Sequence, residues 1–267
     1  MSINVNRPLV SIVTPSYNCG KYIEGNILNI KEQNYPFIEH IIIDGGSEDN
    51  TIDILKKNGD HITWISEPDN GMYDAINKGF AMANGEIFTF INADDRYHNA
   101  NTINLVVNEF LKSPSVDFTY GYCAFTNEGG EILYVYKTPT FYRKIATAFP
   151  RNVFHQPTCF WRKRVHIGFD NSFRHCGDSY FFRYLCKNHV GKNIPHIIAK
   201  FMVRENCISF LNRKRMSGED ERVFGREAER KVPLYLKLID LFYIRTFLNL
   251  SANLKRFCLH CRRRTYL

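Results

Sequence analysis

Short apolar runs alternate with amphipathic segments along the first half of the chain, and this alternation constrains the fold more than any other feature. The apolar runs predict strands at 9–14, 38–43, 62–65, 86–91 and 116–122. The segments between them carry apolar residues on one side and predict helices at 19–33, 51–57, 72–83 and 101–112. Such alternation is typical of an α/β fold, with a mostly parallel sheet between two layers of helices.

The second half of the chain is less regular. It predicts a hairpin strand at 131–136, strands at 157–161 and 196–203, and a helix at 179–188. Residues 212–231 are strongly charged and predict a linker or an exposed helix, and 233–264 predict one or two basic amphipathic helices. We therefore expect a main domain over 1–211, with halves at about 8–122 and 123–211, and a helical extension over 212–267.

The excess of positive charge lies late in the chain. The formal net charge is +8, and five basic residues fall within the last thirteen: Lys255, Arg256, Arg262, Arg263 and Arg264. Clustered basic charge suits an anionic partner such as lipid headgroups, although a solvated tail has the same composition. The apolar run 234–250 is broken by Lys237, Asp240 and Arg245, so we expect this tail to lie on a membrane and not to span it.

The eight cysteines are scattered, and the N-terminus lacks the basic and apolar pattern of an export signal. We therefore expect a cytoplasmic protein with free thiols. Cys258 and Cys261 form a C-x-x-C pair, but a structural zinc site needs a second pair of ligands.

Polar residues follow three of the predicted parallel strands. Ser16, Tyr17 and Asn18 follow the first, residues 44–49 the second and 94–95 the fourth. Ligands of such folds bind outside the carboxyl ends of the strands, so these residues predict one site.

Three carboxyl groups in this pattern suggest chemistry. Asp94 and Asp95 are adjacent at a strand end, where a divalent cation bridging two phosphates would offset their repulsion; an ordinary acidic turn has the same residues. Asp178 stands at the start of a helix among aromatic residues. It is either a helix N-cap or a general base for an attacking hydroxyl.

Four motifs in order carry a family resemblance: residues 10–18, 42–51, 92–95 and 177–183. Together they closely resemble glycosyltransferase family 2, the inverting enzymes of the GT-A fold, over roughly residues 8–205. The run 66–79 looks like a subgroup that builds bacterial exopolysaccharide and O-antigen units.

The resemblance implies a role for each matching residue. Nucleotide-sugar binding is implied for Pro15, Tyr17, Asn18, Asp44, Ser47, Asp69, Asn77, Lys78, Asn92, Ala93 and Asp94. Asp94 and Asp95 would hold Mn²⁺ or Mg²⁺ against the diphosphate, and Asp178 would be the catalytic base. His155, Gln156 and Arg183 would lie on the acceptor or phosphate side.

Two positions depart from the family pattern. Asn92 stands where the first acid of the D-x-D motif is expected, which lowers the charge offered to a metal. Gly45 replaces an aspartate that helps uridine-using relatives to read the base. This departure leaves the identity of the base open: a UDP-sugar is the expected donor, and GDP- or dTDP-sugars are the alternatives.

The expected acceptor is a hydroxyl of a lipid-linked or oligosaccharide substrate at the inner face of the bacterial membrane, which the tail would contact peripherally. A GT-A fold without catalysis, serving as a binding module, is the alternative from another class. No nucleic-acid partner is expected, because the chain lacks a recognisable nucleic-acid module and its acidic strand ends repel phosphate unless a metal is bound.

Overall fold

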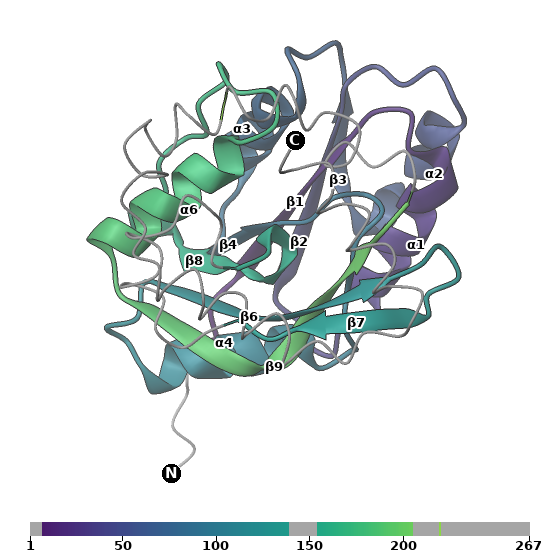
Figure 1. Ribbon diagram of the computed structural model, residues 1–267. Helices are drawn as coiled ribbons and strands as arrows, with labels where there is room; N and C mark the ends of the chain where they lie inside the picture. The colour runs from purple at the N-terminus through teal and green to yellow at the C-terminus, as the bar shows by residue number, and fades with distance from the viewer. Residues whose placement is uncertain (1–6, 139–153, 205–218, 220–267) are drawn as a thin grey trace, which may run out of the picture.

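A computed structural model of the chain describes residues 7–138, 154–204 and 219. Within this part, nine strands form one sheet with helices on both faces (Figure 1). The strands are β1 (Val10–Ser16), β2 (Ile38–Asp44), β3 (Thr63–Ser66), β4 (Ile87–Phe90), β5 (Arg96–Tyr97), β6 (Phe118–Thr126), β7 (Ile132–Tyr136), β8 (Phe160–Arg162) and β9 (Gly191–Met202). The α-helices are α1 (Gly20–Lys31), α2 (Thr51–Lys57), α3 (Met72–Met82), α4 (Thr102–Lys112) and α6 (Gly177–Asn188).

The sheet is mixed, with a parallel half that carries the polar strand ends. Its order is β3-β2-β1-β4-β8-β6-β9-β5, and β7 pairs with β6. Strands β3, β2, β1 and β4 are parallel, β8 is antiparallel between β4 and β6, and β9 runs parallel to β6. The carboxyl ends of β1, β2, β3, β4 and β9 therefore face the same edge of the sheet.

Alternate residues of the strands point to opposite faces of the sheet and pack into two different hydrophobic cores. Val13 of β1 packs with α3 and α6, whereas Val10 and Ile12 pack with α1 and α4. Ile42 of β2 joins α1 and α2 in a smaller cluster on that second face. Figure 1 shows α3 and α6 together on one side of the sheet, with α1 and α2 together on the other.

The predicted elements of the first half are confirmed within a few residues, and the predicted α/β class is correct. The sheet contains more antiparallel pairing than expected. The segment predicted as a strand at 157–161 begins as a 3₁₀ turn, η2 (Gln156–Thr158), and only then becomes β8. Strand β9 begins at Gly191, before the predicted 196, because β6 pairs with a polar stretch that has no strand periodicity of its own.

Several predictions concern residues outside the described part. They are the basic tail, the charged segment apart from Glu219, and the Cys258/Cys261 pair. Among the described residues, no helix is long and apolar enough to cross a membrane. Cys19, Cys123 and Cys159 carry free thiols, as expected.

Candidate functional site

The loops after β1 and β2 are interlocked at the carboxyl edge of the sheet. The backbone N–H of Asn18 donates to Ser47 Oγ at 2.8 Å, and Asn18 Oδ1 accepts from the N–H of Glu48 at 2.9 Å. Asn18 adopts a φ of +50°, which the short amide side chain tolerates. Beside this junction the Tyr17 side chain is 60% exposed, so its ring is free to stack on a flat ligand.

Asp44 is fully buried at the end of β2, and both of its oxygens are occupied. Oδ2 accepts from the N–H groups of Gly46 and Ser47 and from Ser66 Oγ, at 2.8 to 3.1 Å. Oδ1 accepts from Ser47 Oγ at 2.5 Å. Asp44 therefore shapes the loop after β2 and joins it to the end of β3.

The carboxylate of Asp69 lies against Gly45. A Cβ added to Gly45 would stand 2.6 Å from Asp69 Oδ2. The other oxygen, Oδ1, accepts from the N–H of Gly71 at 2.8 Å, which fixes the turn before α3. An acidic side chain therefore fills the space that a side chain at position 45 would take.

The acidic turn after β4 is held through its carbonyl groups. Asn26 on α1 donates from Nδ2 to the carbonyls of Asn92 and Asp95, at 3.1 and 3.2 Å. Arg96 donates from Nη1 to the carbonyls of Ala93 and Asp95, at 2.9 and 2.7 Å. Since backbone groups anchor the turn, its side chains remain available for other contacts.

The two adjacent carboxyl groups of this turn have different environments. Asp95 is 1% exposed, accepts from the N–H of Met202, and is 3.4 Å from Asn92 Nδ2. Burial and the neighbouring charge of Asp94 raise the pKa of Asp95 well above its usual range. Asp94 instead pairs with Arg204, with 2.6 Å between Oδ2 and Nη2. Asp94 is therefore the carboxylate of this turn that a ligand can reach.

Four buried polar atoms near this edge lack a hydrogen-bond partner within the described part of the chain. They are Ser16 Oγ, Asn92 Oδ1, Gln156 Oε1 and Arg204 Nε. Ser16 ends β1, Asn92 follows β4, Arg204 follows β9, and the Gln156 amide donates to the carbonyl of Phe90 in β4. Buried polar groups are ordinarily satisfied, so their gathering here indicates a polar ligand.

The turn also fits a hard divalent cation held jointly with phosphate. Among the described residues, no group of three or more His, Cys, Asp or Glu side chains could hold a metal ion by itself. Asp94 and the orphaned Asn92 Oδ1 offer two oxygen ligands. Magnesium-like ions on nucleotides need only one or two protein ligands, because phosphates and water supply the rest.

Asp178 is the second residue of α6, not its N-cap. Cys176 takes the N-cap position, so the N-cap interpretation of Asp178 is wrong. Asp178 Oδ1 accepts from the N–H of Ser179 at 2.8 Å and from the hydroxyl of Tyr73 at 3.2 Å. Burial raises the pKa of Asp178 to about 6, and these two hydrogen bonds lower it in part. A carboxyl group with this pKa is suited to accept a proton near neutral pH.

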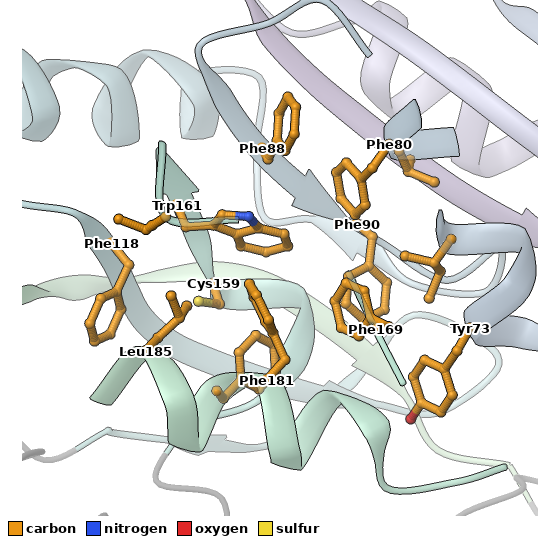
Figure 2. Close-up of a cluster of buried hydrophobic side chains, with 14 of the residues drawn as sticks. Tyr73, Phe80, Phe88, Phe90, Phe118, Cys159, Trp161, Phe169, Phe181 and Leu185 are labelled. Atoms are coloured by element: carbon orange, nitrogen blue, oxygen red, sulfur yellow. The ribbon is translucent and has the colours of Figure 1, made fainter. Parts of the chain in front are cut away.

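The packing of Tyr73 fixes this carboxyl group. The Tyr73 ring lies at the edge of the aromatic cluster and stacks on Phe169 at 5.8 Å (Figure 2). A Cβ on Gly177 would meet the Tyr73 ring at 2.9 Å, so only glycine allows α6 to begin this close to α3. The side chain of Asn77 clamps the same region by bonding both the N–H and the carbonyl of Phe169, each at 2.8 Å.

Glu219 closes the loop before α6. Its carboxylate accepts from the N–H groups of Arg174, His175 and Cys176, at 2.8 to 2.9 Å. Arg174 in turn donates from Nη1 to the carbonyl of Asn70 at 2.8 Å. These contacts join the loop before α3 to the loop that carries Asp178, and they involve a residue from the segment predicted as a linker.

Other residues with expected roles lie in different surroundings. Pro15 is buried within β1, opposite Ile43 of β2. Lys78 on α3 pairs with Glu67 at 2.7 Å. Arg183 lies on α6, where burial lowers its pKa.

His155 is half-buried, with its ring edge-on to the rings of Phe125 and Tyr136, and desolvation lowers its pKa to about 4. A neutral imidazole packed against two aromatic rings is typical of a histidine with a structural role. Gln156, beside it, turns toward the end of β4.

Sequence reasoning missed several residues of this region. They are Asn26, Tyr73, Arg96, Arg204 and Glu219. Asn26 left a signal, because it falls on the apolar face of its helix with Ile23, Ile27 and Ile30. The others gave none, because their partners are distant in the sequence.

With this geometry established, comparison with known proteins decides the family. The family model described as "Glycosyl transferase family 2" matches residues 11–169, which is more than half of the chain. The chain belongs to glycosyltransferase family 2. This is the family that the motifs predicted.

Curated relatives of this family 2 chain match about half of its length. An uncharacterized glycosyltransferase of Mycobacterium tuberculosis is 33% identical over 119 residues, 44% of this chain and 45% of that protein. The putative teichuronic acid biosynthesis glycosyltransferase TuaG of Bacillus subtilis is 33% identical over 46% of this chain and 50% of its own. The hyaluronan synthase of Pasteurella multocida is 32% identical over 54% of this chain and 15% of that protein. The chain thus spans at most about half of these relatives.

Solved structures share the GT-A fold of family 2. The mannosyltransferase PcManGT from Pyrobaculum calidifontis, in complex with GDP-Man and Mn²⁺, matches with a TM-score of 0.63 and 22% identity, covering 86% of this chain and 67% of its own. S. aureus TarS 1-349 in complex with UDP-GlcNAc matches with a TM-score of 0.60 and 21% identity, covering 74% and 60%. At these identities the similarity establishes the fold.

Proposed function

We propose that this family 2 enzyme moves a sugar from a nucleoside diphosphate, with inversion, to a hydroxyl of a lipid-linked or oligosaccharide acceptor in bacterial surface polysaccharide synthesis. The observation that carries the proposal is the group of orphaned buried polar atoms at the carboxyl edge, beside the one reachable carboxylate of the turn, Asp94. The curated name of TuaG, a teichuronic acid enzyme, supports the polysaccharide context.

In this proposal Asp178 is the general base. Its carboxylate takes the proton of the acceptor hydroxyl while that oxygen forms a bond to the anomeric carbon. The bond from this carbon to the phosphate oxygen breaks, and its electron pair leaves with the nucleoside diphosphate. Attack opposite the leaving group inverts the configuration. The hydrogen bond from Tyr73 orients the carboxylate before the acceptor arrives.

The nucleoside would bind at the interlocked loops. Tyr17 offers an exposed ring for stacking, and Asn18 and Ser47 fix its position. Asp69 brings a carboxylate to the place that Gly45 leaves open, and a carboxylate accepts a hydrogen bond from the imide N–H of uracil. This supports a UDP-sugar despite the glycine at position 45. Thymine and guanine also carry ring N–H donors, so dTDP- and GDP-sugars belong in the test.

Asp94 and Asn92 would hold Mn²⁺ or Mg²⁺, which when bound neutralises charge on the leaving diphosphate. Asp95, whose pKa is raised by burial and by the neighbouring charge of Asp94, would support this turn from inside the protein. Residues 212–267, which lie outside the described part apart from Glu219, would contact an anionic membrane surface at the inner face of the cell membrane.

Thermal stability in the presence of nucleotide sugars tests this function. A ligand that binds only the folded protein stabilises it, by about 2.7 kcal/mol at a ligand concentration of 100 times its Kd, and so raises the unfolding midpoint. We expect one donor class, most directly UDP-sugars, to raise the midpoint more with Mn²⁺ than with EDTA. Asp178→Asn should keep this shift and abolish transfer, and Asp94→Ala should lose the metal-dependent part. Absence of a shift with all UDP-, dTDP- and GDP-sugars would refute the proposed donor class.

A further inference from the structure

A cation of the protein itself already neutralises the carboxylate proposed to hold the metal. Arg204, just beyond β9, places Nη2 2.6 Å from Asp94 Oδ2. Its guanidinium also lies over the ring of Tyr22, 4.8 Å from the ring centre. The side chains of Asp94 and Arg204 are 14% and 27% exposed, so solvent screens their attraction only in part.

The neighbours of this pair leave Arg204 as the cation that faces Asp94. Asn92 contributes no charge, and Asp95 is turned into the protein, where it is 1% exposed and accepts a hydrogen bond from the N–H of Met202. Glu128, a further acidic neighbour of Arg204, pairs with Lys21 on α1. A divalent cation approaching Asp94 therefore meets a carboxylate whose charge Arg204 has already offset.

Arg204 also retains unused donor capacity. Its Nε is buried without a hydrogen-bond partner within the described residues. A guanidinium binds phosphate through two parallel N–H groups, one of which can be Nε–H. A diphosphate at this edge would satisfy Nε and compete with Asp94 for the guanidinium.

We propose that Arg204 is an exchangeable cation: it pairs with Asp94 in the nucleotide-free enzyme and transfers to the diphosphate of the donor, which releases Asp94 for the divalent metal. This proposal rests on the function proposed above for Asp94. Its consequence is that metal and nucleotide bind cooperatively. The free enzyme holds Mn²⁺ weakly, and the nucleotide diphosphate strengthens Mn²⁺ binding beyond what its own phosphates add.

Binding of Mn²⁺ to the full-length protein tests the exchange. This binding is measured from the electron paramagnetic resonance signal of free Mn²⁺. The proteins are wild type, Arg204→Gln, Arg204→Lys and Asp94→Asn, each without nucleotide and with UDP. Arg204→Gln should bind Mn²⁺ alone about tenfold more tightly than wild type, within the usual range of coupling between two sites. It should bind UDP in the presence of Mn²⁺ about tenfold more weakly, because the phosphate contact is lost.

Arg204→Lys is the matched control. It keeps the positive charge beside Asp94, so the affinity for Mn²⁺ alone should stay near that of wild type. A fourth variant, Tyr22→Leu, removes the ring under the guanidinium without changing a charge. It should move both affinities in the same directions as Arg204→Gln, by a smaller factor.

The outcomes separate this inference from the proposed function. Unchanged Mn²⁺ affinity in Asp94→Asn would refute the metal role of Asp94 and the exchange with it. If Asp94→Asn loses Mn²⁺ while Arg204→Gln binds it no better than wild type, the exchange alone is refuted. Opposite changes in metal and nucleotide affinity in Arg204→Gln would establish it.

Discussion

The hydroxyl of Tyr73 tunes the proposed base, and its removal should change the pH dependence of transfer in a defined direction. Burial raises the pKa of Asp178 from its ordinary 3.8 to about 6. The base acts only when deprotonated, so kcat/KM of the wild type should rise with pH and reach half of its plateau near pH 6.

Tyr73→Phe removes the hydroxyl that donates to Asp178 Oδ1 at 3.2 Å. This hydrogen bond stabilises the charged form, and its loss costs the carboxylate about 1 kcal/mol. One pKa unit corresponds to about 1.4 kcal/mol, so the pKa should rise by about 0.7 unit. The half-point of kcat/KM should then move to about pH 6.7, with a nearly unchanged plateau above pH 8.

The assay is the pH profile of kcat/KM, measured between pH 5 and 9 with the donor found by thermal stability. Tyr97→Phe serves as a control, because Tyr97 is equally buried but lies in the core cluster on the opposite face of the sheet. Its profile should match that of the wild type. An acid limb in Tyr73→Phe that stays in place or moves to lower pH would refute the assignment of Asp178 and Tyr73.

Four further changes have expected outcomes. Because the folded-state pKa of Asp178 is raised, the folded protein favours the protonated carboxyl group and loses this stability as pH rises through about 6. Asp178→Asn should therefore be more stable to thermal unfolding than wild type at pH 7.5, by up to about 3 kcal/mol, but not at pH 4. A lower unfolding midpoint for Asp178→Asn than for wild type at pH 7.5 would contradict this. Gly177→Ala should press on the Tyr73 ring, cost about 1–3 kcal/mol in thermal stability and shift the acid limb upward; an unchanged midpoint and profile would exclude the tight contact. Glu219→Gln should lower the free energy of unfolding by about 2 kcal/mol and speed hydrogen exchange at 174–176, because one amide oxygen replaces a carboxylate that accepts from three N–H groups. Unchanged hydrogen exchange at 174–176 would argue against this anchor. Deletion of 233–267 should move the protein from anionic vesicles into solution, and equal vesicle binding would refute the membrane role of the tail.

The fold of the first half could be read from the sequence because its signals are local. Strand β1 and helix α3 follow from the period of their own apolar residues, and both were predicted within two residues. The short strand β5 and the polar start of β9 were not predicted, because each depends on pairing with a distant strand. The antiparallel insertion of β8 was missed for the same reason.

The site divides in a similar way. The sequence predicted that Tyr17, Asp44 and Asp94 lie together, because polar residues at the ends of parallel strands meet at one edge of the sheet. The sequence could not show that Asp44 uses both of its oxygens to shape a loop. These hydrogen bonds depend on how the loop after β2 folds and meets β3.

The sequence by itself determined the order of strands and helices, the edge at which the site lies, and the family to which the chain belongs, since local periodicity and short motifs carry this information. Only the tertiary structure separated the two adjacent carboxyl groups, burying Asp95 and leaving Asp94 paired with Arg204. Only the burial of Asp178 in the tertiary structure raised its pKa into the range of a general base, and the hydrogen bond from Tyr73 lowers this pKa in part. Burial and charge pairing depend on residues that are distant in the sequence and meet only in the folded protein. The spacing of residues along the chain therefore does not predict them.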